Sequence, residues 1–208
     1  MEYYVFNKPR GCITARRDER HSTVMDYFPD EMRDRIFPIG RLDKDTEGML
    51  IFTDDGPLFY ELMQPDKKVS KTYFFWAKGS ITEEKISELR AGAAIYPDKS
   101  ILTSPAKLEI LERRALIDIK HLLSDEDEKL TRKKGETPVF SGLLTITEGK
   151  KHQVKRMIKY AGCKVVYLKR VAIGALYLDE SLKLGEYRAL TDEELSKLKG
   201  LSHFGVTE

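Results

Sequence analysis

The chain has 208 residues, of which 41% are hydrophobic and 34% are charged, and its net charge is only +2. This length and apolar content fit one large or two small globular domains with a buried core. No apolar stretch reaches the length that a membrane-spanning helix needs. Two cysteines, Cys12 and Cys163, cannot by themselves build a disulfide framework or a four-ligand zinc site. Residues 1–6 lack the basic-then-apolar pattern of a signal peptide, so we expect a cytoplasmic protein with no membrane partner.

The small net charge hides an uneven distribution along the chain. Residues 149–170 contain eight Lys or Arg and no acid, whereas residues 179–194 contain six acids and two cations. Cations gathered in one region are typical of proteins that dock an anionic ligand on one face.

The first half of the chain is predicted to form strands separated by turns and short helices. Apolar, aromatic and β-branched residues predict strands at 3–6, 12–15, 50–52 and 70–77. A turn is expected at 7–11, a polar loop at 16–21, and short helical turns at 24–28 and 31–37. Thr82, followed by two acids, predicts the start of a helix that Gly92 ends.

The second half continues the same mixture. Strands are predicted at 106–111, 115–121, 142–147, 164–168 and 175–178. Residues 124–137 are almost wholly polar or charged and predict a long surface loop. A helix is expected at 152–161, which Gly162 ends, and a last helix begins at the capping box that Thr191 opens. Many strands with interspersed helices predict an α+β fold.

The segment 40–56 combines acids with a following apolar strand. Asp43, Asp45 and Glu47 precede the predicted strand 50–52. Acids beside a core strand are held on a rigid element, which favours catalysis. Two other interpretations stay open: an exposed turn in which Arg41 pairs with a neighbouring acid, and a calcium loop, because the acids match several positions of the EF-hand pattern. The strand after the segment argues against calcium.

The basic segment 150–157 predicts phosphate contacts on a helix. A run of cations often forms only a solvated face. Residues 149–170, which include this segment, contain eight cations and no acid, and this favours binding to an RNA backbone. If the apolar side chains of the helix face the core, Lys155 lies at the edge of that face and Arg156 nearly opposite. His152 is interpreted as a hydrogen-bonding or phosphate-contacting group, because no second His or Cys stands at metal-ligand spacing.

Two further segments are interpreted as candidates for contact with RNA. Tyr73, on the predicted strand 70–77, is a candidate for packing against a base that an enzyme exposes, although a strand tyrosine is more often a core residue. The loop 8–20 contains five cations and two acids, which alone is a weak signal for RNA binding.

Together, in order, these segments resemble the RNA pseudouridine synthases of the RsuA-type ribosomal RNA group. The similarity spans nearly the whole chain and is carried by residues 7–11, 40–48, 71–73, 148–157, 166–174 and 184–191. The resemblance implies a mixed or antiparallel sheet in two subdomains that flank a central catalytic cleft. It also implies one catalytic domain over residues 1–208 without the S4-type RNA-binding domain that many relatives carry.

The resemblance also implies the roles of individual residues. Asp43 would be the essential aspartate, Tyr73 would pack against the target uracil, and Lys155 would pair with the aspartate. Substrate contacts are expected from Arg41, Lys8, Arg10, His152, Gln153, Arg156 and Arg170.

The implied reaction is the isomerisation of a specific uridine to pseudouridine in RNA, most simply ribosomal RNA of either subunit. Asp43 could act as nucleophile or as base, and the sequence leaves this choice open. Neither a metal nor an organic cofactor is expected, and the protein is expected to be a monomer. The alternative is an RNA-binding or ribosome-assembly protein that keeps the fold without the chemistry.

Overall fold

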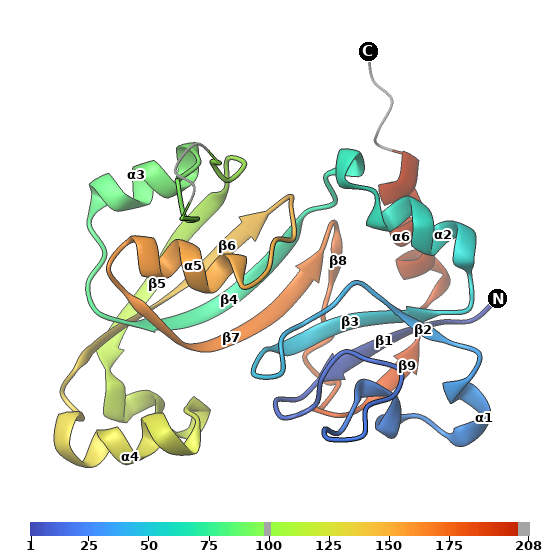
Figure 1. The fold of residues 1–208 in the computed structure, drawn as a ribbon, viewed down its shortest axis with the longest axis horizontal. Coiled ribbons are helices and arrows are strands. Elements are labelled where there is room, and N and C mark those ends of the chain that lie inside the picture. The colour runs from blue at the N-terminus through green and yellow to red at the C-terminus, as the bar shows by residue number, and fades with distance from the viewer. Residues whose placement is uncertain (98–100, 204–208) are drawn as a thin grey trace. The chain divides into compact units, whose positions relative to one another are not determined.

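The computed structural model describes residues 1–97 and 101–203, which form two compact units of helices and strands (Figure 1). The first unit combines Met1–Lys71 with Lys169–Glu208, and the second is Thr72–Leu168. The predicted α+β class and the division into two parts are confirmed. The catalytic cleft between the two parts stays a prediction.

The first unit is built around one central strand. Its strands are β1 (Tyr3–Lys8), β2 (Phe37–Ile39), β3 (Glu47–Thr53), the end of β7 (Lys164–Ile173), β8 (Leu176–Tyr177) and β9 (Tyr187–Ala189). Its helices are η1 (Val24–Tyr27), α1 (Asp30–Arg33), α2 (Gly56–Met63), η2 (Pro65–Lys67) and α6 (Asp192–His203). The strand order is β7-β3-β1-β9. Strand β3 pairs antiparallel with β1 and β2 and parallel with β7, which makes the sheet mixed, as predicted.

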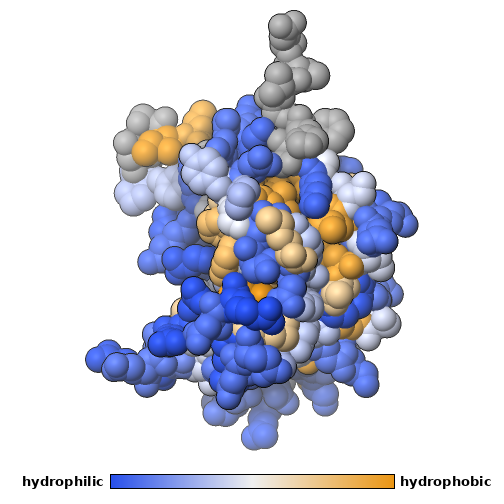
Figure 2. Space-filling model, turned by 90° about the vertical axis from the view of Figure 1, so that its right-hand side faces the viewer, coloured by the Kyte–Doolittle hydropathy of each residue, from blue (hydrophilic) through white to orange (hydrophobic). Residues whose placement is uncertain are grey.

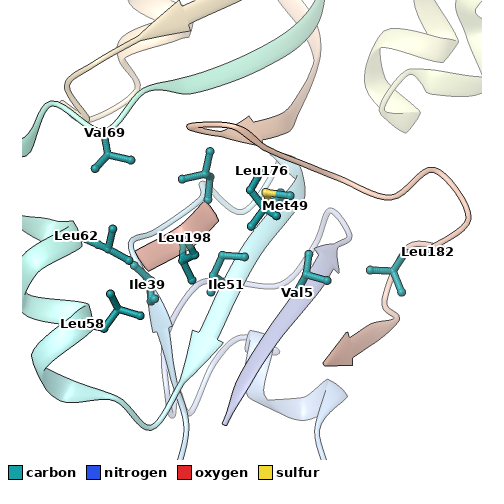
Figure 3. Packing of buried hydrophobic residues seen from close by; sticks show 11 residues of the cluster. Val5, Ile39, Met49, Ile51, Leu58, Leu62, Val69, Leu176, Leu182 and Leu198 are labelled. Carbon is teal, nitrogen blue, oxygen red and sulfur yellow. The ribbon is translucent and has the colours of Figure 1, made fainter. Parts of the chain in front are cut away.

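Every residue of β3 is buried, because apolar side chains cover both faces of the strand. On one face Met49 and Ile51 pack against side chains of α2 and α6, among them Leu58 and Leu198 (Figure 3). On the other face Leu50 and Phe52 join an aromatic cluster formed with β1 and the segment 24–36. The segment that carries Asp43 therefore leads directly into the best-anchored strand of the unit.

The second unit contains a smaller sheet with helices beside it. Its elements are β4 (Lys71–Lys78, of which Lys71 belongs to the first unit), α3 (Glu83–Ala91), β5 (Lys107–Ala115), η3 (Leu116–Leu122), α4 (Asp125–Lys134), β6 (Pro138–Ile146), α5 (Gln153–Tyr160) and the start of β7. The strand order is β5-β6-β4-β7. The predicted caps are confirmed: Thr82 accepts from the main chain of Lys85, and Gly92 ends α3.

Four local predictions were wrong. The strand predicted at 115–121 is instead the 3-10 helix η3 from Leu116 onward, because the Asp118 carboxylate accepts from the Ala115 N–H and closes a turn. Residues 12–15 form only an isolated bridge between Ile13 and Thr23, and Thr14 bonds to a neighbouring loop. The predicted turn at 7–11 begins later, because β1 continues to Lys8.

The fourth correction is α4, where the sequence predicts a surface loop. Ser124 caps the helix by accepting from the Asp127 N–H. Four acids lie in the first turn and three cations in the last, which complements the helix dipole. Asp127 also pairs with Lys78 at 2.7 Å, and the two cations around this carboxylate hold its pKa below the ordinary value against the effect of burial. Charge order and one tertiary ion pair thus turn a polar segment into a helix.

Gly48 allows β3 and β7 to approach each other closely. Its φ is +104°, and a Cβ atom at this position would collide with the backbone oxygen of Arg170 and lie 2.7 Å from its nitrogen. We expect Gly48→Ala to lower the free energy of unfolding by roughly 2–4 kcal/mol, because strain and overpacking add. Urea denaturation would measure the loss. Gly56→Ala is the matched control, since a Cβ there meets nothing within 4 Å; equal losses in both variants would contradict the argument.

None of the helices in the described part of the chain combines the length and hydropathy that crossing a bilayer requires. Figure 2 shows one face of the molecule, where hydrophilic side chains predominate and apolar ones gather near the centre.

Candidate active site

The aspartate segment, residues 40–46, connects β2 to β3 in the first unit. It is a compact turn in which the Thr46 N–H donates to the Asp43 carbonyl at 3.1 Å. The side chain of Asp43 is half-buried, and that of Arg41 is exposed. Strands, and not helices, flank the segment, which contradicts the EF-hand interpretation. The geometry places one carboxylate at the surface of a segment whose backbone is fixed.

Lys8 is the residue that fixes this backbone. Its side chain is fully buried, and its ammonium group donates to carbonyl oxygens of Pro9 at 3.0 Å, Asp43 at 3.1 Å and Thr46 at 3.0 Å. Burial lowers the pKa of Lys8, and nearby negative charges, including those of Asp43 and Asp45, oppose this effect. In the structure the charge of Lys8 holds the aspartate segment, and its predicted substrate contact stays a prediction.

Two further contacts support the same segment. Thr14 bonds to both main-chain groups of Leu42, at 2.8 Å and 3.1 Å. Arg10 pairs with the buried Glu47 at 2.8 Å, directly after the segment. Arg10 was predicted to contact substrate, and in the structure this ion pair joins it to the start of β3.

Arg170, for which the sequence predicts a substrate contact, is also buried. Its side chain is 2% exposed, and its Nε atom donates to the Met49 carbonyl at 2.8 Å. Its Nη2 atom has no hydrogen-bond partner among the described residues. Arg170 lies opposite Gly48 in the β3–β7 pairing and supports the strand that follows Asp43, while its predicted substrate contact stays a prediction.

Lys71 lies close enough to Arg170 for the two charges to interact. Burial, together with the Arg170 charge, lowers the pKa of Lys71 from 10.5 to about 8. The unfolded chain therefore binds this proton more tightly between pH 8 and 10.5, so that stability due to Lys71 rises with pH in this window.

We expect the unfolding free energy of the wild type, relative to Lys71→Met, to increase from pH 8 to 10 by up to about 1.4 kcal/mol per pH unit. Urea denaturation at pH 7, 8, 9 and 10 would measure this difference. Parallel pH curves for the two proteins would contradict the interpretation of Lys71.

An open depression in the first unit offers further cations. It has a volume of about 430 Å³ and is lined by Arg16, Arg17, Arg33 and Asp34. Arg17 pairs with Asp34 at 2.9 Å, and both side chains are largely exposed. The depression includes part of the loop 8–20, for which the sequence indicates RNA binding weakly.

In the second unit, Tyr73 lies on β4 with its side chain 9% exposed. The hydroxyl of its neighbour Thr72 shares a hydrogen bond of 2.9 Å with that of Thr145. The ring is thus held on a paired strand, and its predicted contact with uracil stays a prediction.

The start of α5 carries the other predicted residues of the second unit. Gln153 is 3% exposed and clamps the turn before the helix: it donates to Glu148 at 2.6 Å and accepts from the Lys150 N–H at 3.0 Å. Its predicted substrate contact stays a prediction. His152 is exposed and adopts a left-handed backbone, with φ 55°.

Lys155 is half-buried beside the buried side chains of Val154, Met157 and Ile158, and the edge position that the helical wheel gives it stays a prediction. Arg156 is also half-buried. Asp43 thus belongs to the first unit, while Tyr73 and Lys155 belong to the second. The pairing of Asp43 with Lys155 stays a prediction.

Sequence reasoning missed Glu47, Thr14 and Glu148 as supporting residues. Glu47 is the first residue of β3, directly after the aspartate segment, and its place in the sequence predicts no ion pair with Arg10. Thr14 and Glu148 act through tertiary hydrogen bonds, for which a single sequence gives no signal.

Comparison with known proteins supports the resemblance. Residues 2–160 match the family model described as RNA pseudouridylate synthase. The chain is 45% identical over 197 residues to an uncharacterized RNA pseudouridine synthase, YtzG, of Bacillus subtilis, covering 94% of this chain and 72% of that protein.

Relatives with more specific names are also similar. The chain is 34% identical to the ribosomal small subunit pseudouridine synthase A of Salmonella typhimurium, covering 94% of this chain and 73% of the relative. It is 35% identical to the ribosomal large subunit pseudouridine synthase B of Bacillus subtilis, covering 98% and 73%. A crystal structure of a pseudouridylate synthase matches with a TM-score of 0.77 and 34% identity, covering 95% of this chain and 73% of that one.

Proposed function

The chain belongs to the RNA pseudouridine synthase family, and from this premise we propose that it isomerises a specific uridine of ribosomal RNA with Asp43 as the essential carboxylate. The observation that carries the proposal is the way Asp43 is held. The fully buried Lys8 ammonium binds the carbonyl of Asp43 and that of Thr46, three residues later, while the Asp43 carboxylate is only half-buried. A rigid backbone under an accessible carboxylate suits a group that must keep a fixed geometry toward substrate.

The chemistry needs only one carboxylate. The bond between N1 of uracil and C1′ of ribose breaks, the base rotates while bound, and C5 bonds to C1′. The C5 proton leaves and N1 gains a proton, so that substrate and product have the same composition. Asp43 acts on the ribose, either as nucleophile or as base. Lys155 is proposed as the basic residue that pairs with this carboxylate, and Tyr73 as the residue that packs against the uracil.

The substrate is proposed to be ribosomal RNA, because named relatives act on the small or the large subunit. Arg41 and His152 are exposed and are proposed to contact this RNA, together with the half-buried Arg156. The protein is proposed to act as a monomer in the cytoplasm.

The proposal is tested with the purified full chain and three RNA transcripts: small-subunit ribosomal, large-subunit ribosomal and a transfer RNA. Uridine labelled with tritium at C5 releases the label when C5 bonds to C1′. We expect release from one ribosomal transcript, up to one equivalent per RNA. Tight RNA binding without release from any transcript would favour the assembly-factor alternative.

A further inference from the structure

Tyr96, in the second unit, brings two cations to one aromatic ring. The Lys150 Nζ atom lies 5.1 Å and the Arg156 Cζ atom 5.3 Å from the ring centroid. Both distances are within the range of cation–π attraction. Lys150 precedes α5 and Arg156 lies on it, whereas Tyr96 lies in the segment after α3 (Figure 1). The ring therefore gathers charges from a segment distant in sequence.

Within the part of the chain that the structure describes, one carboxylate forms an ion pair with one of these two cations. Glu148 approaches Lys150 at 3.3 Å, but one of its carboxylate oxygens already accepts from Gln153 and from the Ser104 N–H. Across residues 1–97 and 101–203, Arg156 forms no ion pair with a carboxylate. Among the described residues, two cations thus share one ring and only Lys150 has a carboxylate partner, which leaves local positive charge.

This positive site has a surface that an RNA strand could use. The Lys150 side chain is 37% exposed. Beside it lie Leu102, whose carbonyl is 3.5 Å from the Lys150 ammonium, and Ile101; their side chains are 57% and 45% exposed. Single-stranded nucleic acids bind where cations meet the phosphates and apolar or aromatic groups meet the bases.

A second tyrosine of the same unit provides an internal comparison. Lys85 lies 4.5 Å from the Tyr160 ring centroid, but its ammonium also pairs with Glu88 at 2.7 Å. The Tyr160 hydroxyl donates to the same carboxylate at 2.7 Å. At Tyr160 the cation is neutralised, and the contact has a structural role. Tyr96 differs because it holds two cations and less compensating charge.

We propose that Tyr96 positions Lys150 and Arg156 as a pair that binds backbone phosphates of the substrate RNA, outside the nucleotide that reacts. The inference rests on the proposed function, which supplies the RNA. Lys150 and Arg156 contact the RNA, and Tyr96 acts through them. The Tyr96 hydroxyl is buried without a hydrogen-bond partner among the described residues, so the ring and not the hydroxyl performs this role.

The test measures the affinity of the full chain for transcribed small- and large-subunit ribosomal RNA fragments between 50 and 200 mM salt. We expect Tyr96→Leu to weaken binding about five- to tenfold at 100 mM salt. Tyr96→Phe should stay within about twofold, because it keeps the ring and removes an unpaired hydroxyl. Tyr160→Leu is the matched control and should also stay within about twofold of the wild type.

A double variant, Lys150→Met with Arg156→Met, shows whether Tyr96 acts through these cations. Its plot of log affinity against log salt should be shallower by about 1.4, or about 0.7 for each lost phosphate contact on a single strand. Tyr96→Leu added to this double variant should weaken binding less than twofold further. In turnover, Tyr96→Leu should raise KM more than it lowers kcat.

Two results would overturn the inference: an unchanged salt dependence in the double variant, or a loss from Tyr96→Leu that is as large in the double variant as in the wild type. If Tyr96→Leu fails to fold, the salt dependence of the double variant still tests whether Lys150 and Arg156 bind phosphates. If the protein binds RNA in this way but forms no pseudouridine, the proposed function fails and the inference stands. If pseudouridine forms while these variants bind like the wild type, only the inference fails.

Discussion

Asp43→Asn is expected to lower the rate of pseudouridine formation roughly 10⁴-fold or more, the order of loss seen when an essential group of a catalytic unit is removed. Asparagine has nearly the same shape as aspartate but carries no charge, so it can act neither as nucleophile nor as base. The measurement is single-turnover tritium release from the best ribosomal transcript, with RNA affinity measured in parallel. Affinity should change less than about threefold, because the backbone of the segment is held by Lys8.

Asp45→Asn is the matched control for this prediction. Asp45 is exposed two residues further along the same segment, and it has no assigned part in the reaction. We expect the rate of pseudouridine formation by Asp45→Asn to stay within about threefold of the wild-type rate. Comparable losses of rate in both variants would show that the reaction depends on the total negative charge of the segment and not on the Asp43 carboxylate.

Lys8→Met is expected to lower the free energy of unfolding by roughly 2–4 kcal/mol. The substitution keeps the length and apolar stem of the side chain but removes the ammonium group. Carbonyl oxygens of Pro9, Asp43 and Thr46 then lose a charged donor in a buried place, where unpaired polar groups are costly. Urea denaturation with two spectroscopic probes would measure the loss and test for two-state behaviour.

Lys44→Met serves as the control, since Lys44 is exposed on the same segment and should change stability by less than about 0.5 kcal/mol. The Lys8 variant should also lose activity where it is still folded, because the position of Asp43 is no longer fixed. A Lys8→Met variant as stable as the wild type would contradict this, because it would mean that the carbonyls of Pro9, Asp43 and Thr46 do not need the ammonium group.

The elements that were predicted correctly are those with a strong local pattern. The run Leu50–Phe52 identified the central strand, and the spacing of apolar residues in 152–161 identified α5 together with the half-buried edge position of Lys155. Caps at Thr82 and Thr191 are likewise local, because each joins residues three apart.

The features that could not be predicted from the sequence depend on contacts between distant segments. The helix α4 is fixed partly by Asp127, whose partner Lys78 is far away in the chain. A lysine followed by proline and arginine, as at 8–10, is typical of an exposed basic loop. Only the fold shows that the Lys8 ammonium lies among carbonyls, including that of Asp43, 35 residues later. The internal hydrogen bonds of the buried Gln153 and Arg170 likewise join distant segments or elements and have no local signal in the sequence.

The central claim is that Asp43 converts one uridine of ribosomal RNA to pseudouridine. It is tested most directly by mapping pseudouridine in total RNA from cells without this gene, using carbodiimide labelling and reverse-transcription stops. The account predicts that one stop in ribosomal RNA disappears, returns with the wild-type gene, and does not return with Asp43→Asn. Restoration of that stop by Asp43→Asn would contradict it.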